Sequence, residues 1–187
     1  EVSNETLVQV FAIISAADPS LGQIPQNHFA LIQNLKDTGT ESQKQRWFQA
    51  VLHGARLGNG GPEKKGKAAV MTDVTAHLAR AADGSLRVSG TRFYSTGALF
   101  AHWIPFRAAD EQGRGVQVWV RRDAPGVQVI DDWNAFGQRT TASGSVVFDR
   151  VLVEEDHVLE SWRFVDKPSL SGPISQLIQA SIDAGIA

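Results

Sequence analysis

The stretch VQVWVRRDAPGVQVI (residues 116–130) decides the fold class of this sequence. Its valines stand at every second position on both sides of a DAPG turn, at Val116, Val118, Val120, Val127 and Val129. Successive side chains of a β-strand point to opposite faces, so this period of two indicates two strands, each with one buried face. Asp, Pro and Gly favour a tight turn between them.

The same alternation appears on both sides of this stretch. Alternating runs cover residues 70–76 and 86–88, with an Asp-Gly turn between them, and residues 145–153 give another pair of strands. Strands at this spacing, separated by turns, predict an antiparallel β-barrel or sandwich between about residues 66 and 155.

The first third of the chain and its end show helical spacing instead. Helices are expected at 5–17, 22–36 and 41–54, with capping boxes that begin at Ser20 and Thr40. Near the end of the chain, four apolar residues share one helix face: Ile174, Leu177, Ile178 and Ile182. Helices, then strands, then a helix predict an α+β fold.

The α+β fold is expected to have three parts. These are an N-terminal helical region (1–55), a central β domain (56–160) and the beginning of a C-terminal helical bundle (161–187). The sequence opens without Met and stops inside a helical pattern, so both ends look cut and we expect a fragment. Because a lone amphipathic helix gains most of its stability from packing, we expect the last helix to dock on another chain, or the true protein to continue past Ala187.

Composition excludes several classes of function. The chain has 187 residues, of which 42% are hydrophobic and 20% charged, an ordinary globular balance. A formal net charge of −2 gives no reason to expect nucleic acid or a membrane as a partner. The absence of Cys excludes disulfides, thiolate metal sites and a Cys nucleophile, and it fits a reducing compartment. No apolar run approaches the roughly 18 residues of a membrane span. We therefore expect a cytoplasmic protein.

Two features of the sequence are similar to known functional sites but lack residues that such sites need: a P-loop-like segment and a set of histidines. GPEKKGKA (61–68) is close to a P-loop, but it lacks the hydroxyl that would bind Mg²⁺ and follows a helix, so we interpret it as a charged surface loop. The five histidines contain no pair at metal-binding spacing, and no metal site is predicted. Only His28 has a noteworthy neighbourhood, and its plainest interpretation is a partly buried, hydrogen-bonded helix residue.

Three loops concentrate hydroxyl, amide and aromatic side chains: LGNGG (57–61), RFYSTGALFAHW (92–103) and DDWNAFGQRTTASGS (131–145). Ordinary connecting loops are small and polar. Backbone amides beside Gly, with neutral donors from Asn59, Ser95 and Thr96, suit a flat heteroaromatic ring that bears carbonyls and nitrogens. Trp133 and Phe136 could wall such a ring, because aromatic side chains offer area and stacking.

The third of these loops also offers an anion site. Arg139 suits a phosphate or a neighbouring subunit, because a guanidinium makes bidentate contacts. Three hydroxyl residues stand beside it: Thr140, Thr141 and Ser143. The alternative is that all three loops merely pack the β domain, and the residues alone leave both interpretations open.

The same loops resemble those of the acyl-CoA dehydrogenase superfamily. GTRFYSTGALFAHW (90–103) is similar to the family segment that lies against the flavin ring. FGQRTTASGSVVFDRVLV (136–153) is similar to its Gly-x-Arg-x-Ser/Thr loop and the strand that follows. The resemblance covers essentially the whole chain. It implies an N-terminal helical domain, a central β domain and a C-terminal four-helix bundle that builds a homodimer or homotetramer.

One branch of the superfamily is closer, the flavin-dependent monooxygenases of sulfur compounds of the dibenzothiophene monooxygenase type. DDWNAFGQRTTASGS, LGN (57–59) and ADPSLGQIPQNHF (17–29) carry this resemblance. It implies an enzyme that takes reduced FMN from a separate flavin reductase and oxidises an organosulfur or related small molecule with O₂.

The resemblance also assigns roles to residues. Asn59 and Thr96 match positions that contact the flavin, Trp133 matches the pocket wall, and His28 lies near the substrate end. His28 and Asn59 are therefore the catalytic candidates. The cofactor-binding candidates are Asn59, Tyr94, Ser95, Thr96, Trp133, Arg139, Thr141 and Ser143.

Some features depart from the resemblance. Asn27 stands where the dibenzothiophene enzymes carry Tyr, which suggests a smaller or more polar substrate. Arg92 replaces a usual Lys, and Ser95 a usual apolar residue. GNGGPEKKG (58–66) replaces a segment that supports flavin and acyl-CoA binding in the dehydrogenases. Two alternatives stay open: an FAD-dependent acyl-CoA dehydrogenase, and a flavin-free scaffold that keeps the fold.

Overall fold

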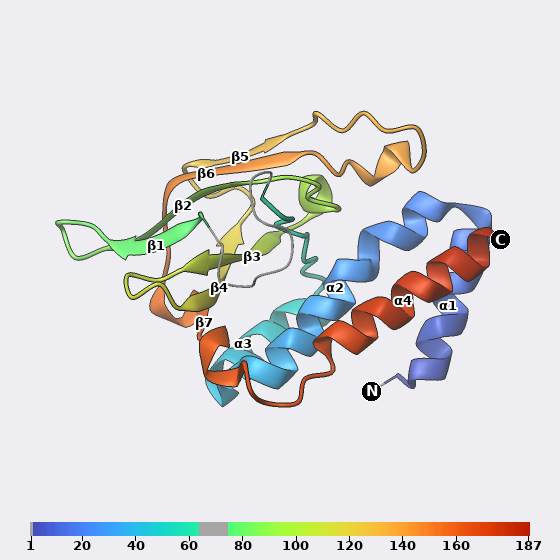
Figure 1. Ribbon diagram of the computed structural model, residues 1–187, viewed down its shortest axis with the longest axis horizontal. Helices are drawn as coiled ribbons and strands as arrows, with labels where there is room; N and C mark the ends of the chain where they lie inside the picture. The colour runs from blue at the N-terminus through green and yellow to red at the C-terminus, as the bar shows by residue number, and fades with distance from the viewer. Residues whose placement is uncertain (1, 64–74) are drawn as a thin grey trace.

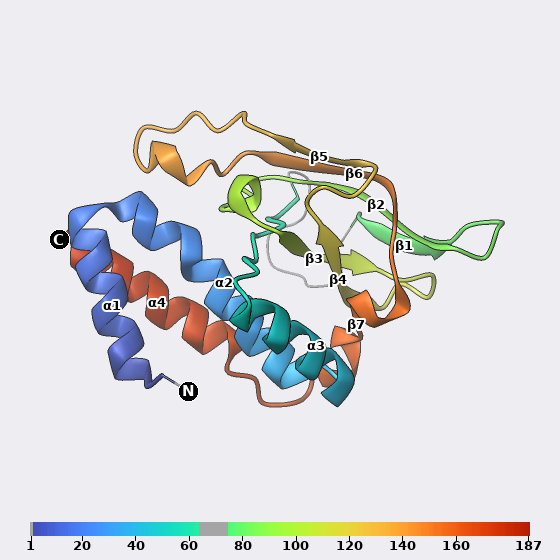
Figure 2. The same ribbon diagram turned by 180° about the vertical axis from the view of Figure 1, so that it is seen from behind.

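Helices and a β-sheet form the two parts of the computed structural model, which describes residues 2–63 and 75–187 (Figures 1 and 2). The helices are α1 (Asn4–Ala17), α2 (Pro19–Thr38), α3 (Glu41–Leu52) and α4 (Ser171–Ile186). The strands are β1 (His77–Arg80), β2 (Leu86–Arg92), β3 (Trp103–Ala109), β4 (Gly115–Arg121), β5 (Val127–Ile130), β6 (Ser145–Leu152) and β7 (Val158–Leu159). The α+β class is confirmed.

The helices begin where capping side chains stand. Thr40 and Gln43 form the expected capping box of α3: the Thr40 hydroxyl accepts from the Gln43 amide at 3.2 Å, and the Gln43 side-chain oxygen accepts from the Thr40 amide at 3.0 Å. The capping box expected at Ser20 was wrong. Asp18 caps α2, because its carboxylate accepts from the Ser20 amide at 2.7 Å, and the helix begins earlier than expected, at Pro19.

The strands form one sheet in the order β5-β6-β2-β1-β3-β4-β7. All neighbours are antiparallel except β1 and β3, which pair in parallel through His77 and Ala109. The expectation of a purely antiparallel sheet therefore needs one correction. The hairpin β1–β2 uses one edge of β1, and the edge left over faces β3, which runs in the same direction. The expected strand residues 70–74, and residues 64–68 of the GPEKKGKA segment, lie outside the described residues.

The stretch 116–130 does form two strands joined by a turn, but these strands do not pair with each other. β4 pairs with β3 and β7, whereas β5 pairs with β6. Within the turn, the Val127 amide donates to the Ala124 carbonyl at 3.0 Å. The turn thus carries the chain from one half of the sheet to the other.

The sheet curls over its own core. Phe106 of β3 and Phe148 of β6 stack with 3.9 Å between ring centroids, although β1 and β2 separate these strands in the sheet. Both halves of the sheet therefore enclose one apolar interior, as the expected barrel or sandwich would. Fully buried residues on this interior include Val88, Ile104, Val118, Val146 and Val151.

The apolar stripe of α4 packs within the chain. Ile178 and Ile182 are fully buried against Phe11 of α1, with Leu7 and Ile174 at the margin. For these two residues the expected partner is therefore found within the chain, because α1 and α2 pack against α4, whereas Leu177 of the same stripe is 36% exposed.

Three tryptophans join the helices to the sheet. Trp47 of α3 lies edge-on to Trp103 of β3 and tilted against Trp119 of β4, with 4.6 Å between ring centroids in each pair. Trp47 and Trp119 are almost completely buried, at 1% and 0% exposure. The leucines that complete this cluster are Leu31, Leu35, Leu57 and Leu159.

We expect Trp47→Ala to lower the free energy of unfolding by about 3–5 kcal/mol, because it removes a buried aromatic ring and leaves a cavity. Denaturant unfolding measures the loss. Leu52→Ala is a matched control on the same helix, because Leu52 is 78% exposed, and its effect should stay within about 0.5 kcal/mol. Equal losses in the two variants would contradict the role given to Trp47.

Candidate functional site

Residues 57–60 run alongside β3, beginning with an isolated β-bridge between Leu57 and Trp103. The amides of Gly58 and Gly60 donate to carbonyls of β3 at 2.9 and 3.0 Å. A Cβ on Gly60 would lie 2.3 Å from a β3 side-chain carbon, so this close approach requires glycine. Next to these contacts the Asn59 amide donates to the Thr96 carbonyl at 3.0 Å. Two of the predicted site residues, Asn59 and Thr96, are thereby brought side by side.

A chain of hydrogen bonds then joins Thr96 to the third loop. The Thr96 and Ser143 hydroxyls lie 2.7 Å apart, and the Ser143 and Thr141 hydroxyls 2.8 Å apart. The Thr141 hydroxyl and the Trp133 indole N–H both donate to the Gln138 carbonyl, at 2.9 and 3.0 Å. The structure therefore connects Thr96 of the second loop to three predicted residues of the third loop, Trp133, Thr141 and Ser143.

In the second and third loops, three residues other than glycine adopt the left-handed backbone conformation that most residues avoid. Tyr94, Gln138 and Ala142 have φ values of +52°, +47° and +46°. The Tyr94 ring lies edge-on to Trp133, with 6.2 Å between centroids. Such residues each cost of order 1 kcal/mol, persist only where their surroundings fix them, and cluster at functional sites.

Ser95 is a buried link between the same segments. Ser95 is 1% exposed, and its amide donates to the Gly144 carbonyl at 2.9 Å. Its hydroxyl accepts from the Gly61 amide at 3.3 Å. Ser95 therefore ties the first loop to the second and the second to the third.

The tip of the third loop lies apart from this arrangement. Phe136 is fully exposed, at 107%, so it is not packed against the rest of this chain, and its place in a pocket wall stays a prediction. Arg139, at the start of the 3₁₀ turn η2 (Arg139–Thr141), is exposed as well. The loop extends beyond the sheet, and η2 packs against α2 (Figure 1).

His28 reaches the same region from α2. Its Nδ1 accepts a hydrogen bond from the Leu57 amide at 3.1 Å, which places the proton of the neutral ring on Nε2. Burial lowers the pKa of His28, so the ring is neutral at neutral pH. Because Leu57 is two residues before Asn59, both catalytic candidates are positioned by one short segment.

A buried ion pair supports these loops, and sequence patterns did not reveal it. Arg92 Nη1 lies 3.3 Å from Glu63 Oε1, with side-chain exposures of 5% and 7%. Glu63 also accepts from the amides of Thr75 and Ala76 at 2.7 and 2.9 Å. Burial alone raises the pKa of Glu63, but these hydrogen bonds and the Arg92 charge outweigh it, so its pKa is lowered. Two features of the sequence could have indicated this pair. Glu63 lies in the segment (58–66) that differs from the dehydrogenases, and Arg92 replaces a usual Lys.

No family model matches the chain. Dibenzothiophene monooxygenase of Rhodococcus erythropolis is 30% identical over 195 residues, which cover 97% of this chain and 46% of that protein. The FMN-bound structure of TdsC from Paenibacillus sp. A11-2 has a TM-score of 0.86 at 34% identity, and covers 98% of this chain and 48% of TdsC. The chain is a partial-length homologue of dibenzothiophene monooxygenase.

A second TdsC structure and one further curated relative are also similar to this chain. TdsC in complex with FMN and indole has a TM-score of 0.84 at 32% identity, over 98% of this chain and 48% of TdsC. The probable FMNH₂-dependent monooxygenase SfnC of Pseudomonas putida is 33% identical over 114 residues, which are 56% of this chain and 28% of SfnC. The chain thus spans about half the length of the curated dibenzothiophene monooxygenases it matches. Among the residues that are described, no helix is long and apolar enough to cross a bilayer.

We expect Glu63→Gln to lower the free energy of unfolding at pH 7 by about 3 kcal/mol, because it leaves Arg92 buried without a countercharge. The folded-state pKa of Glu63 is below its ordinary value of 4.5. Its carboxylate therefore contributes stability above that pH, and the contribution is lost as the pH falls through the folded-state pKa. The deficit of the variant, measured by urea unfolding, should shrink below pH 4.5.

Asp123→Asn is the control for this comparison. Asp123 pairs with Arg121 at 2.7 Å, but both side chains are more than half exposed. Exposed pairs contribute little, so no measurable change is expected. A Glu63→Gln deficit that stays constant between pH 7 and pH 3 would contradict a role for the Glu63 charge.

Proposed function

We propose that this chain is the N-terminal helical and β-sheet portion of a reduced-FMN-dependent monooxygenase that oxidises an organosulfur or related small compound with O₂. The observation that carries the proposal is the hydrogen-bonded connection between Asn59, Thr96, Ser143, Thr141 and Trp133. The similarity of this chain to FMN-bound TdsC, which covers 98% of this chain, supports the same proposal.

The residues of the site fit a flavin. Asn59 and Thr96 offer neutral hydrogen-bonding groups to the polar edge of the ring, and the Tyr94 and Trp133 rings offer an aromatic wall. Arg139, at the outer end of the third loop, is the residue that would hold the phosphate. Bound reduced flavin supplies the electrons that activate O₂, so one oxygen atom enters the substrate and the other leaves as water.

The remaining candidates act by holding this geometry. Ser95, Thr141 and Ser143 are buried, and each is hydrogen-bonded to another loop residue. They fix the loops before the cofactor arrives, which reduces the ordering that binding requires.

His28 is the proposed proton-bearing residue. Its Nδ1 is occupied by the Leu57 amide, so Nε2 carries the one hydrogen that a neutral ring can present to a bound molecule. Because burial keeps the ring neutral, it donates a hydrogen bond without bringing a positive charge into the site.

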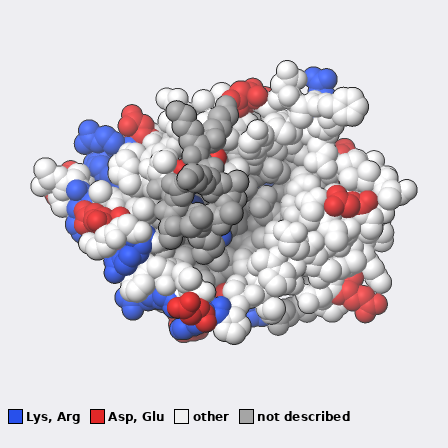
Figure 3. Space-filling model, in the orientation of Figure 1, with Lys and Arg blue, Asp and Glu red and all other residues white. Residues whose placement is uncertain are grey.

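The partners in this proposal are a flavin reductase, which delivers reduced FMN, and the rest of a homodimeric or homotetrameric enzyme. On the face that Figure 3 shows, fewer charged side chains appear over the helices than over the sheet. Apolar side chains exposed on these helices include Val10, Ile13 and Leu21 at 45%, 71% and 58%. An exposed apolar face of this kind is typical of an interaction surface. Sedimentation of the full-length enzyme tests the assembly.

The first test is flavin binding by the full-length enzyme. We expect Thr96→Val to raise the Kd for FMN by about tenfold, because it removes a hydroxyl from the site and leaves the Ser143 hydroxyl without that partner. Flavin fluorescence measures the Kd. Thr140→Val is the control, because Thr140 is exposed on the same loop. A wild-type protein that binds no flavin would instead support the flavin-free scaffold, and one that holds FAD and is reduced by an acyl-CoA would support the dehydrogenase.

The second test separates His28 from binding. His28→Asn keeps an oxygen acceptor for the Leu57 amide but has no hydrogen at the Nε2 position. We expect kcat to fall by about 100-fold or more, while the Kd for FMN stays near the wild-type value. Oxidation of dibenzothiophene or indole, with reduced FMN supplied by a flavin reductase, measures kcat. Unchanged turnover in the variant would remove His28 from the mechanism.

A further inference from the structure

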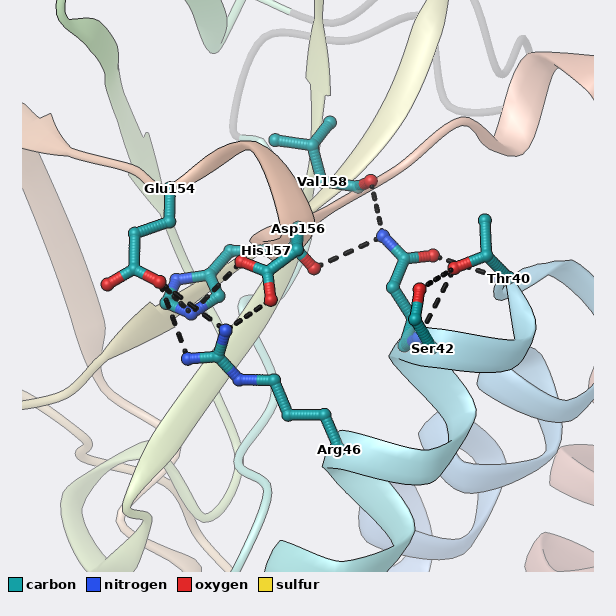
Figure 4. A network of polar contacts seen from close by, with 8 residues as sticks. Thr40, Ser42, Arg46, Glu154, Asp156, His157 and Val158 are labelled. Carbon is teal, nitrogen blue, oxygen red and sulfur yellow. Dashed lines mark hydrogen bonds and ion pairs between the residues drawn. The ribbon is translucent and has the colours of Figure 1, made fainter.

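Three potential metal ligands gather just before β7, away from the predicted flavin residues. Glu154, Asp156 and His157 each bring one ligand atom to within 4.8 Å of the others. His157 Nε2 lies 3.4 Å from Glu154 Oε2 and 3.9 Å from Asp156 Oδ1. Figure 4 shows these side chains and the Arg46 guanidinium gathered beside α3.

A 3₁₀ turn, η3 (Glu155–His157), creates this arrangement. Side chains three residues apart eclipse in such a turn, so Glu154 and His157 lie on one face. The His157 amide donates to the Glu154 carbonyl at 3.0 Å and closes the turn. Asp156 directly precedes His157, and its Oδ1 lies 3.9 Å from the His157 Nε2.

Gln43 of α3 holds the backbone on both sides of His157. Its side-chain nitrogen donates to the Asp156 carbonyl at 3.1 Å and to the Val158 carbonyl at 2.9 Å. Its side-chain oxygen accepts from the Thr40 amide, which fixes the orientation of the amide group. The ligand positions are therefore set by α3 before any ion binds.

The His157 ring has a buried nitrogen that lacks a hydrogen bond within the described residues, which points to a ligand independently of the clustering. His157 is 8% exposed, and its Nε2 makes no hydrogen bond to any residue that the structure describes. Buried polar atoms are normally hydrogen-bonded, so this nitrogen requires an explanation.

Arg46 is the cation that faces the carboxylates in this structure. Its Nη1 contacts Asp156 and lies 3.4 Å from Glu154 Oε2. The Arg46 side chain is 40% exposed, and exposed ion pairs contribute little, so it can turn into solvent at small cost. Without Arg46, two carboxylates and one neutral imidazole carry a charge of about −2, which matches a divalent ion.

We propose that Glu154, Asp156 and His157 form a binding site for a divalent transition-metal ion such as Zn²⁺, and that the ion displaces Arg46. One imidazole and two carboxylates suit Zn²⁺, Co²⁺ or Ni²⁺ better than Mg²⁺ or Ca²⁺, which prefer oxygen ligands alone. None of the three ligands is a predicted flavin residue, so the site stands independently of the proposed monooxygenase function.

The tryptophan cluster provides a direct readout. The Trp47 and Trp103 rings lie 5.2 and 5.1 Å from the His157 ring, measured between centroids. Co²⁺ or Ni²⁺ bound at His157 should therefore quench part of the tryptophan fluorescence in a saturable way. Zn²⁺, which does not quench in this manner, should reverse the effect by competition. The titration uses the tag-free chain, and calorimetry with Zn²⁺ gives an independent Kd.

Three variants decide the outcome. We expect His157→Gln to weaken Zn²⁺ binding by at least about tenfold, because it removes the nitrogen ligand. Arg46→Gln should tighten binding by about tenfold, because it removes a positive charge that opposes the ion at close range. His53→Gln is the control, an exposed histidine at the end of the same helix, and should change nothing.

The Arg46→Gln variant separates the proposal from a folding effect, because a partly unfolded protein would not gain affinity at this site. Unchanged affinity in His157→Gln, or loss of affinity in His53→Gln alone, would mean an adventitious ion only and would overturn the proposal. Failure of Arg46→Gln to tighten binding would equally overturn the displacement of Arg46.

Discussion

The packing of Trp47 against Trp103 and Trp119 is the contact on which the rest of the structure depends. Trp47 belongs to α3, whereas the other two rings belong to adjacent strands of the sheet. Large aromatic side chains dominate the energetics of a core, and close packing lets them meet in few ways. The helices therefore cannot shift along the sheet without opening a buried interface, and this fixes α2 and α3 relative to β3.

The predicted site takes its geometry from the same cluster. Leu57 is buried among the leucines that surround Trp47, and its amide holds His28 while the following residues bond to β3. His28 lies on a helix and Asn59 on the segment alongside β3, yet both are positioned by contacts of residues 57–60. A change in how α2 meets the sheet would thus move the two catalytic candidates relative to each other.

Local patterns in the sequence predicted the elements but not their partners. Period-two valines and a capping box identified β4, β5 and α3, because those signals depend on neighbouring residues. Pairing depends on distant residues, so the same valines gave no sign that β5 would pair with β6 instead of β4. The site shows the same limit. Its loops were found by composition, whereas the buried Glu63–Arg92 pair and the outward position of Phe136 exist only in three dimensions.

The strained residues bear on whether the loops bind something or merely pack the β domain. Of the four non-glycine residues with positive φ among those described, three lie in the second and third loops: Tyr94, Gln138 and Ala142. A loop that only connects strands could relieve such strain with glycine at little cost. Here the surroundings maintain it, because Trp133 and Thr141 both bond to the Gln138 carbonyl. Strain kept at this cost fixes the position of specific groups, and that favours a binding site over simple packing.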